Sequence, residues 1–121
     1  MLIVDEDPRA GEILSERLIA RGFEVSTAAD AAGARAVAAA SPGSIDVVVA
    51  DLVLEDGNGI EVAGEVRRTS PDVRVLLTSA LVKDPADVSH LLEEGMVFVA
   101  PNAGPDGVVL AVERAARLSW T

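Results

Sequence analysis

The sequence predicts an α/β fold: a single doubly wound (βα)5 domain, in which a five-stranded parallel sheet carries helices on both faces. Short runs rich in Val, Ile and Leu alternate with amphipathic segments along the 121 residues. Pro, Gly or Asp stands at most junctions, and acidic residues directly follow two of the apolar runs. The alternation indicates strands joined by helical crossovers, and the junction residues indicate where each element begins and ends.

Five segments have the composition of strands, because they are short, apolar and bounded by turn residues. The run that ends at Ala50 is the densest in valine, whereas the segment that begins at Phe23 alternates more loosely. The expected strands cover residues 2–4, 23–28, 45–50, 73–77 and 96–100.

Helices are expected between these strands, on the evidence of caps and of apolar spacing. Asp7-Pro8 and Asp84-Pro85 each combine an N-capping side chain with a proline suited to the first helical turn. Asp30 is a similar cap for an alanine-rich segment. The expected helices run from Pro8 to just before Gly22, and over residues 31–40, 60–68, 85–94 and 105–118.

Three carboxylates follow strands that we expect to be neighbours. In a doubly wound sheet the first and third strands lie side by side, and their carboxyl ends share one crevice. This arrangement brings Asp5, Glu6 and Asp51 together. Gathered carboxylates repel one another, and Mg²⁺ relieves that repulsion because it prefers oxygen ligands and uses one or two carboxylates with water or phosphate oxygens.

The same crevice has groups suited to phosphoryl transfer. An aspartate can accept a phosphoryl group as an acyl phosphate, and nearby donors then neutralise charge on the phosphoryl oxygens. Thr78 and Ser79 follow the fourth strand and bring hydroxyl groups to this edge. Asp56, Glu61 and Glu65 are expected to be solvated surface charges.

The overall charge restricts the partners. Twenty acidic residues against ten basic ones give a net charge of −10, which argues against direct binding of nucleic acid or of an anionic membrane. There is no cysteine, so disulfides and thiolate metal sites are excluded. No apolar run approaches the ~20 residues of a membrane span, and no signal peptide is recognisable. We therefore expect one soluble, cytoplasmic domain over residues 1–121.

Four short motifs, in order on the right elements, resemble a response regulator receiver domain of two-component signalling. They are Leu-Ile-Val-Asp-Glu-Asp-Pro at residues 2–8, the strand before Asp51, Asn58-Gly59, and Leu-Leu-Thr-Ser-Ala at residues 76–80. The resemblance covers essentially the whole chain. It implies a flavodoxin-like fold, Mg²⁺ as cofactor, and a histidine kinase or histidine phosphotransfer protein as phosphoryl donor.

The resemblance implies that Asp51 is the phosphoacceptor. Glu6, Asp51 and the backbone carbonyl of Val53 would bind Mg²⁺, and Asp5 would assist through water. The implied chemistry is self-catalysed phosphotransfer rather than turnover of a substrate. Apolar Val53 and Leu81 would not orient a water molecule, so we expect slow loss of the phosphoryl group.

The resemblance also implies a switch. Ser79 would be its hydroxyl, because it is the one followed by alanine, and Phe98 would be the aromatic residue that rotates inward with it. Thr78 is expected to turn into the packing of the sheet. The output or homodimer surface would be the face built by residues 84–94, 96–100 and 105–118.

One departure from the family pattern concerns a lysine that normally follows the fifth strand. Ala100 or Pro101 stands there, depending on the alignment, and Lys83 is the only lysine in the chain. One hypothesis is that Lys83 substitutes for the missing group. Two other functions remain open: a degenerate receiver that acts as a phosphorylation-independent interaction module, and a small Mg²⁺-dependent phosphatase with an aspartate nucleophile.

Overall fold

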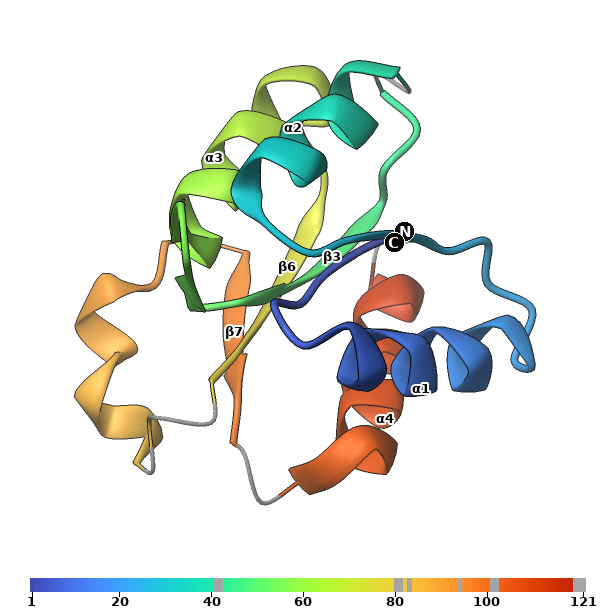
Figure 1. Cartoon of the computed structure of the whole chain (residues 1–121). Helices are drawn as coiled ribbons and strands as arrows, with labels where there is room; N and C mark the ends of the chain where they lie inside the picture. Colours follow the sequence, from blue (N-terminus) through green and yellow to red (C-terminus); the bar gives the residue numbers. More distant parts are fainter. Residues whose placement is uncertain (41–42, 80–81, 83, 94, 101–102, 119–121) are drawn as a thin grey trace.

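The computed structural model describes residues 1–40, 43–79, 82, 84–93, 95–100 and 103–118 (Figure 1). Its main sheet has five parallel strands in the order β2-β1-β3-β6-β7. This order confirms the doubly wound fold and the adjacency of the first and third strands. The strands are β1 (Leu2–Val4), β2 (Ser26–Ala28), β3 (Val47–Asp51), β6 (Arg74–Thr78) and β7 (Met96–Val99).

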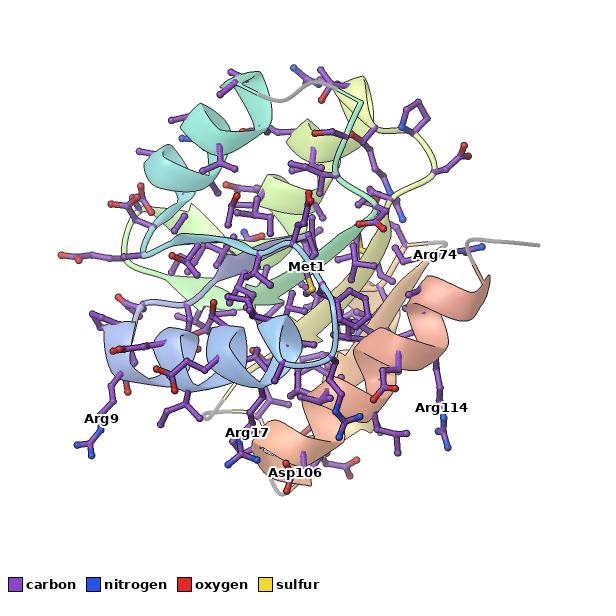
Figure 2. All side chains as sticks on the ribbon, turned by 90° about the vertical axis from the view of Figure 1, so that its right-hand side faces the viewer. Met1, Arg9, Arg17, Arg74, Asp106 and Arg114 are labelled. Carbon is purple, nitrogen blue, oxygen red and sulfur yellow. The ribbon has the colours of Figure 1, made fainter. Side chains whose placement is uncertain are left out.

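Two helices cover each face of the sheet (Figure 1). On one face lie α1 (Pro8–Ile19) and α4 (Gly104–Leu118), and on the other lie α2 (Ala31–Ala40) and α3 (Gly59–Thr69). Each pair of helices is linked by ion pairs across its surface. Arg17 pairs with Asp106 between α1 and α4, as Figure 2 shows from the side. Arg35 Nε lies 2.6 Å from Glu65 Oε2 between α2 and α3.

The core has two apolar layers, because side chains that alternate along a strand point to opposite faces of the sheet. The layer beneath α1 and α4 contains Ile3, Leu14, Leu18, Val47, Val49, Leu76, Val99, Val109 and Val112. The layer beneath α2 and α3 includes Leu2, Val4, Ala31, Ala34, Ala38, Val48, Val62, Val66, Val75 and Leu77. Both layers are almost entirely aliphatic, and the central strands are buried between them.

The structure has side-chain caps at the starts of three helices, and those of Asp7 and Asp30 were predicted. Asp7 accepts a hydrogen bond from the backbone N–H of Arg9 at 3.0 Å, and Pro8 occupies the first turn of α1. Asp30 accepts from the N–H of Gly33 at 2.7 Å. Asn58 caps α3 by accepting from the N–H of Glu61 at 2.9 Å. These contacts fix the start of each helix, because they satisfy N–H groups that have no partner inside the helix.

The second strand is shorter than predicted. It covers Ser26–Ala28 only, paired residue for residue with Leu2–Val4. β2 is an edge strand whose one partner is three residues long, so its ladder ends where the partner ends. Phe23 instead packs against the core layer beneath α1 and α4.

The helix predicted over residues 85–94 is wrong. The structure has two short 3₁₀ turns instead, η1 (Pro85–Asp87) and η2 (Ser89–Leu91). Asp84 does cap the first of them, through a 3.0 Å hydrogen bond from the N–H of Ala86. Val88 is the one buried side chain among those described in the segment, and Leu92 is only partly buried, so little apolar surface favours a longer helix there.

A small antiparallel ribbon, β4 (Val53–Leu54) with β5 (Gly57–Asn58), stands where a loop is predicted after Asp51. Val53 pairs with Asn58 and Leu54 with Gly57. The side chain of Leu54 is buried and ties the ribbon to the core. The ribbon lies between β3 and α3 in the chain, so it sets the path of the backbone that follows Asp51.

Candidate functional site

A cleft of about 500 Å³ opens at the carboxyl edge of the sheet, on the side of α1 and α4. Carboxylates from two strand ends line it, together with two hydroxyl side chains. The polar lining residues are Asp5, Glu6, Asp7, Asp51, Thr78 and Ser79. The apolar wall includes Ile3, Ala10, Leu14, Val49, Val99, Ala100 and Val108. The structure therefore brings together the predicted side chains from the ends of β1, β3 and β6.

Asp51 is the last residue of β3, the central strand of the sheet. The four residues before it are buried, which fixes the strand, and its own side chain is half-buried. The N–H of Val53 lies 3.3 Å from Asp51 Oδ1. Gly59 packs directly behind: a Cβ there would lie 2.6 Å from the backbone oxygen of Asp51, so glycine is required at this position.

The pKa of Asp51 is raised to about 6, mainly by burial and to a smaller extent by the negative charges of Asp5 and Glu6. The hydrogen bond from Val53 opposes this rise. Burial is also the main cause that raises the pKa of Asp5, although the N–H of Asp7 donates to that carboxylate at 2.8 Å and opposes the shift. The cleft thus disfavours the ionisation of several carboxylates at once, and a bound proton or cation would reduce the repulsion between them.

The donor chemistry of the cleft fits Mg²⁺. Across the described ranges, no three acidic or histidine side chains converge closely enough to form a metal-binding group by themselves. A magnesium ion does not need three, because it commonly takes one or two carboxylates and keeps several waters. Asp5, Glu6 and Asp51 offer hard oxygen donors in a cleft where their charges repel one another.

Both hydroxyl groups belong to the cleft, so the expectation that Thr78 packs into the sheet is wrong. Thr78 is paired in register with Asp51 on the adjacent strand, and paired residues of parallel strands point to the same face. It is half-buried and lines the cleft. Ser79 also lines the cleft and is only 4% exposed.

Phe98 is not part of the cleft lining in the described residues. It is partly buried and packs against the core layer beneath α2 and α3, next to Leu77 in the strand register. Its role as a switch residue stays a prediction.

Ala100 lines the cleft beside Val99. None of the described lining residues is basic, so in this part of the chain the carboxylates have no cationic partner at the wall of the cleft. Lys83, Leu81 and Pro101 lie outside the described residues.

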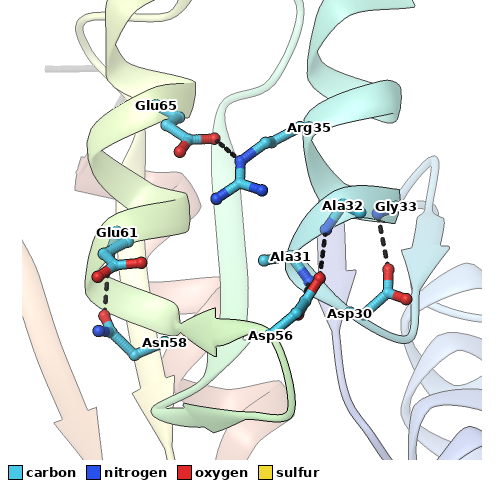
Figure 3. Close-up of polar contacts among 9 residues, drawn as sticks. All are labelled: Asp30, Ala31, Ala32, Gly33, Arg35, Asp56, Asn58, Glu61 and Glu65. Atoms are coloured by element: carbon cyan, nitrogen blue, oxygen red, sulfur yellow. Dashed lines mark hydrogen bonds and ion pairs between the residues drawn. The ribbon is translucent and has the colours of Figure 1, made fainter.

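Asp56 is exposed, as expected, but sequence reasoning missed its hydrogen bonds. Its carboxylate accepts hydrogen bonds from the N–H groups of Ala31 at 2.8 Å and Ala32 at 3.0 Å (Figure 3). Glu65 is also paired, with Arg35. No local signal indicates these contacts, because each joins segments that lie far apart in the sequence.

A doubly wound parallel sheet with carboxylates and hydroxyls gathered at its carboxyl edge defines an α/β protein whose chemistry lies at the switch point of the sheet. The chain belongs to the response regulator receiver domain family, whose family model matches residues 1–100. The resemblance seen in the sequence is thereby confirmed, and the chain is a module of two-component signal transduction.

Relatives and solved structures agree with this assignment. The chain is 39% identical to the probable transcriptional regulatory protein TcrX of Mycobacterium tuberculosis over 80 residues, 66% of this chain and 33% of that protein. It is 39% identical to the photosynthetic apparatus regulatory protein RegA of Cereibacter sphaeroides over 77 residues, 64% of this chain and 41% of that protein. The matched part thus spans less than half of the length of each of these two curated relatives.

Among solved structures, the chain is similar to the response regulator protein TrrA of Thermotoga maritima in complex with Mg²⁺-BeF. The TM-score is 0.72 at 29% identity, with 94% of this chain and 96% of that chain covered. Among the described residues, no helix is both long enough and apolar enough to span a bilayer.

Proposed function

We propose that Asp51 accepts a phosphoryl group from the phosphohistidine of a histidine kinase or of a histidine phosphotransfer protein. The observation that carries this proposal is the position of Asp51, half-buried at the end of the central strand with Asp5 and Glu6 beside it. A carboxylate oxygen of Asp51 forms a bond to phosphorus while the phosphorus–nitrogen bond of the donor breaks. The products are an acyl phosphate and the donor imidazole, which takes up a proton from solvent.

Mg²⁺ would be held by the carboxylates of Glu6 and Asp51 and by the backbone carbonyl of Val53, with Asp5 assisting through water. When bound, it supplies positive charge to the phosphoryl oxygens. The protein contributes the placement of Asp51, and Thr78 and Ser79 bring hydroxyl donors to the same cleft. We propose Ser79 as the switch hydroxyl, as the sequence predicts, and Thr78, which is paired in register with Asp51, as the second candidate.

Loss of the phosphoryl group is proposed to be slow. The Val53 side chain is 45% exposed and apolar, so it does not orient a water molecule toward Asp51. A short half-life, like those of fast chemotaxis-type receivers, would contradict this part of the proposal.

The output or homodimer surface is proposed to be the face made by residues 84–93, β7 and α4. Each of these elements has one large apolar side chain that is about half exposed: Leu91 at 46%, Val97 at 55% and Leu110 at 50%. Single exposed apolar side chains are ordinary, so this proposal requires that the three act together as one contact area for another protein. We propose that the domain acts in the cytoplasm, as the sequence predicts.

The test is intact-mass analysis after incubation with Mg²⁺ and acetyl phosphate, with Asp51→Asn as the control. One added phosphoryl group that is absent from Asp51→Asn supports the proposal. A Lys83→Ala variant that still gains the group shows that Lys83 is not a substitute for the missing lysine. A folded wild type without any adduct would instead favour the phosphorylation-independent interaction module.

A further inference from the structure

We propose that Asp56 is a positioning residue for the site, because it fastens the β4–β5 ribbon behind Asp51 onto the N-terminus of α2. This inference rests on the proposed function of Asp51. The two oxygens of the Asp56 carboxylate each accept one hydrogen bond, from Ala31 N–H to Oδ1 and from Ala32 N–H to Oδ2 (Figure 3).

The chemistry of this contact is favourable. The first N–H groups of a helix have no partner within it, and the helix dipole favours a negative charge at that end. These two hydrogen bonds are the main cause that lowers the pKa of Asp56, and Arg35 lowers it further. The carboxylate of Asp56 is therefore ionised near neutral pH, and its contact with α2 persists there.

The ribbon needs such an anchor. It has two residue pairs, and a two-stranded ribbon of that length is not stable alone. Asn58 fixes one end of the ribbon by capping α3, and Leu54 is buried. Asp56 stands at the turn between the strands and ties the tip of the ribbon to α2.

The orientation of the ribbon matters for the site because Val53 begins it. The N–H of Val53 contacts the carboxylate of Asp51 at 3.3 Å. Its carbonyl oxygen is the backbone group proposed to face Mg²⁺. When the tip is released, both groups gain freedom relative to Asp51, although no catalytic atom is removed.

The helix α2 has a cap and a packing contact besides Asp56. Asp30 caps it independently, through the hydrogen bond from the N–H of Gly33 (Figure 3). The Arg35–Glu65 pair joins it to α3 one turn further along. The chain thus offers a matched control: Asp30→Ala and Asp56→Ala each remove acceptors from the same helix end, but only Asp56→Ala releases the ribbon.

The experiment compares the wild type, Asp56→Ala, Asp56→Asn and Asp30→Ala as full chains. Three quantities are measured: Mg²⁺ affinity by calorimetric titration at constant ionic strength, hydrogen exchange of the amides of residues 53–58, and the rate of phosphorylation by acetyl phosphate. For Asp56→Ala we expect about tenfold weaker Mg²⁺ binding, the low end of the effect of residues that support metal ligands, with faster exchange in the ribbon. Asp56→Asn keeps one neutral acceptor oxygen, so its Mg²⁺ affinity and its ribbon exchange rates should lie between those of the wild type and of Asp56→Ala.

The proposal is overturned when Asp56→Ala and Asp30→Ala change Mg²⁺ affinity equally, or when ribbon exchange in Asp56→Ala matches the wild type. If Asp56→Ala does not fold, the same comparison is made with Asp56→Asn. A wild type that neither binds Mg²⁺ nor gains a phosphoryl group refutes the proposed function instead. The exchange data then still decide whether Asp56 anchors the ribbon.

Discussion

The carboxylate of Asp51 has two opposing requirements. It must be ionised to act as the proposed phosphoacceptor, yet its half-buried place beside Asp5 and Glu6 raises its pKa to about 6. The site therefore costs folding stability at neutral pH, and a bound cation relieves part of that cost.

Asp51→Asn should stabilise the fold at pH 7. The folded-state pKa lies above the ordinary value of 3.8, so the folded protein holds its proton more tightly and loses stability as pH rises from about 4 to about 6. Removal of the charge should raise the free energy of unfolding by about 1 kcal/mol at pH 7 and by little at pH 4. The value at pH 7 is reduced for solvent screening, because the group is half-exposed. Urea unfolding at both pH values measures it. The exposed Asp72→Asn is the control, and an equal gain there would contradict the explanation.

Ala100→Lys should lower the pKa of Asp51. Ala100 lines the same cleft as Asp51, so an ammonium group at this position favours the ionised carboxylate. An NMR pH titration of the Asp51 carboxyl carbon measures the shift. Val97→Lys adds the same charge three residues earlier, within β7, at a position 55% exposed and outside the cleft lining. Similar shifts in both variants would show that the added net charge, rather than proximity, is responsible.

At the scale of elements, the sequence predicted those helix starts that depend on contacts between residues close together in the chain. Asp7, Asp30 and Asn58 cap helices within three residues of themselves, and two of the three caps were predicted from sequence alone. The Asp56 contact with α2 was not predictable, because it depends on the packing of a distant segment. Asp84-Pro85 shows the converse: the cap forms, but too little apolar surface is buried behind it to extend a helix.

The candidate site was predicted to a similar extent. Asp5, Glu6, Asp51 and Ser79 gather at one edge because strand order follows from the fold class. The place of Thr78 was missed, because it depends on the residue at which β6 ends. The strand extends one residue beyond the predicted 73–77. That residue is Thr78, which is therefore paired with Asp51 and points to the same face of the sheet.

Two glycines of α3 should respond oppositely to alanine. A Cβ on Gly59 would meet the backbone oxygen of Asp51 at 2.6 Å and Leu77 Cδ2 at 2.9 Å, so Gly59→Ala should cost about 1–3 kcal/mol. A Cβ on Gly64 meets nothing within 4 Å, so Gly64→Ala should stabilise the helix by about 0.5–1 kcal/mol. Urea midpoints compare the two variants. Shifts in the same direction would mean that α3 is free to move away from β3.

At the scale of the whole molecule, the chain has a net charge of −10 and repels itself. The ion pairs between α1 and α4 and between α2 and α3 lie at the surface, and such pairs typically contribute about 0–1 kcal/mol each. They offset little of the general repulsion, so the thermal stability of the domain should depend on ionic conditions.

Mg²⁺ should raise the melting temperature more than NaCl at the same ionic strength. Both salts screen the net charge, but an ion that binds only the folded state adds about 2.7 kcal/mol at a concentration a hundredfold above its Kd. Differential scanning calorimetry in the two salts measures the difference. Asp51→Asn should lose much of the extra gain. Identical melting curves in the two salts would argue against a magnesium site.

The parallel topology also has a consequence for how the chain folds. Every ladder of the main sheet pairs residues more than twenty positions apart in the sequence, and the second edge of β1 is paired only when β3 has formed. No tight hairpin within this sheet can form early and serve as a template. Loop closure over such distances is slow, so we expect refolding in milliseconds or longer rather than microseconds. The first half of the chain alone should gain little protection while the second half is being synthesised.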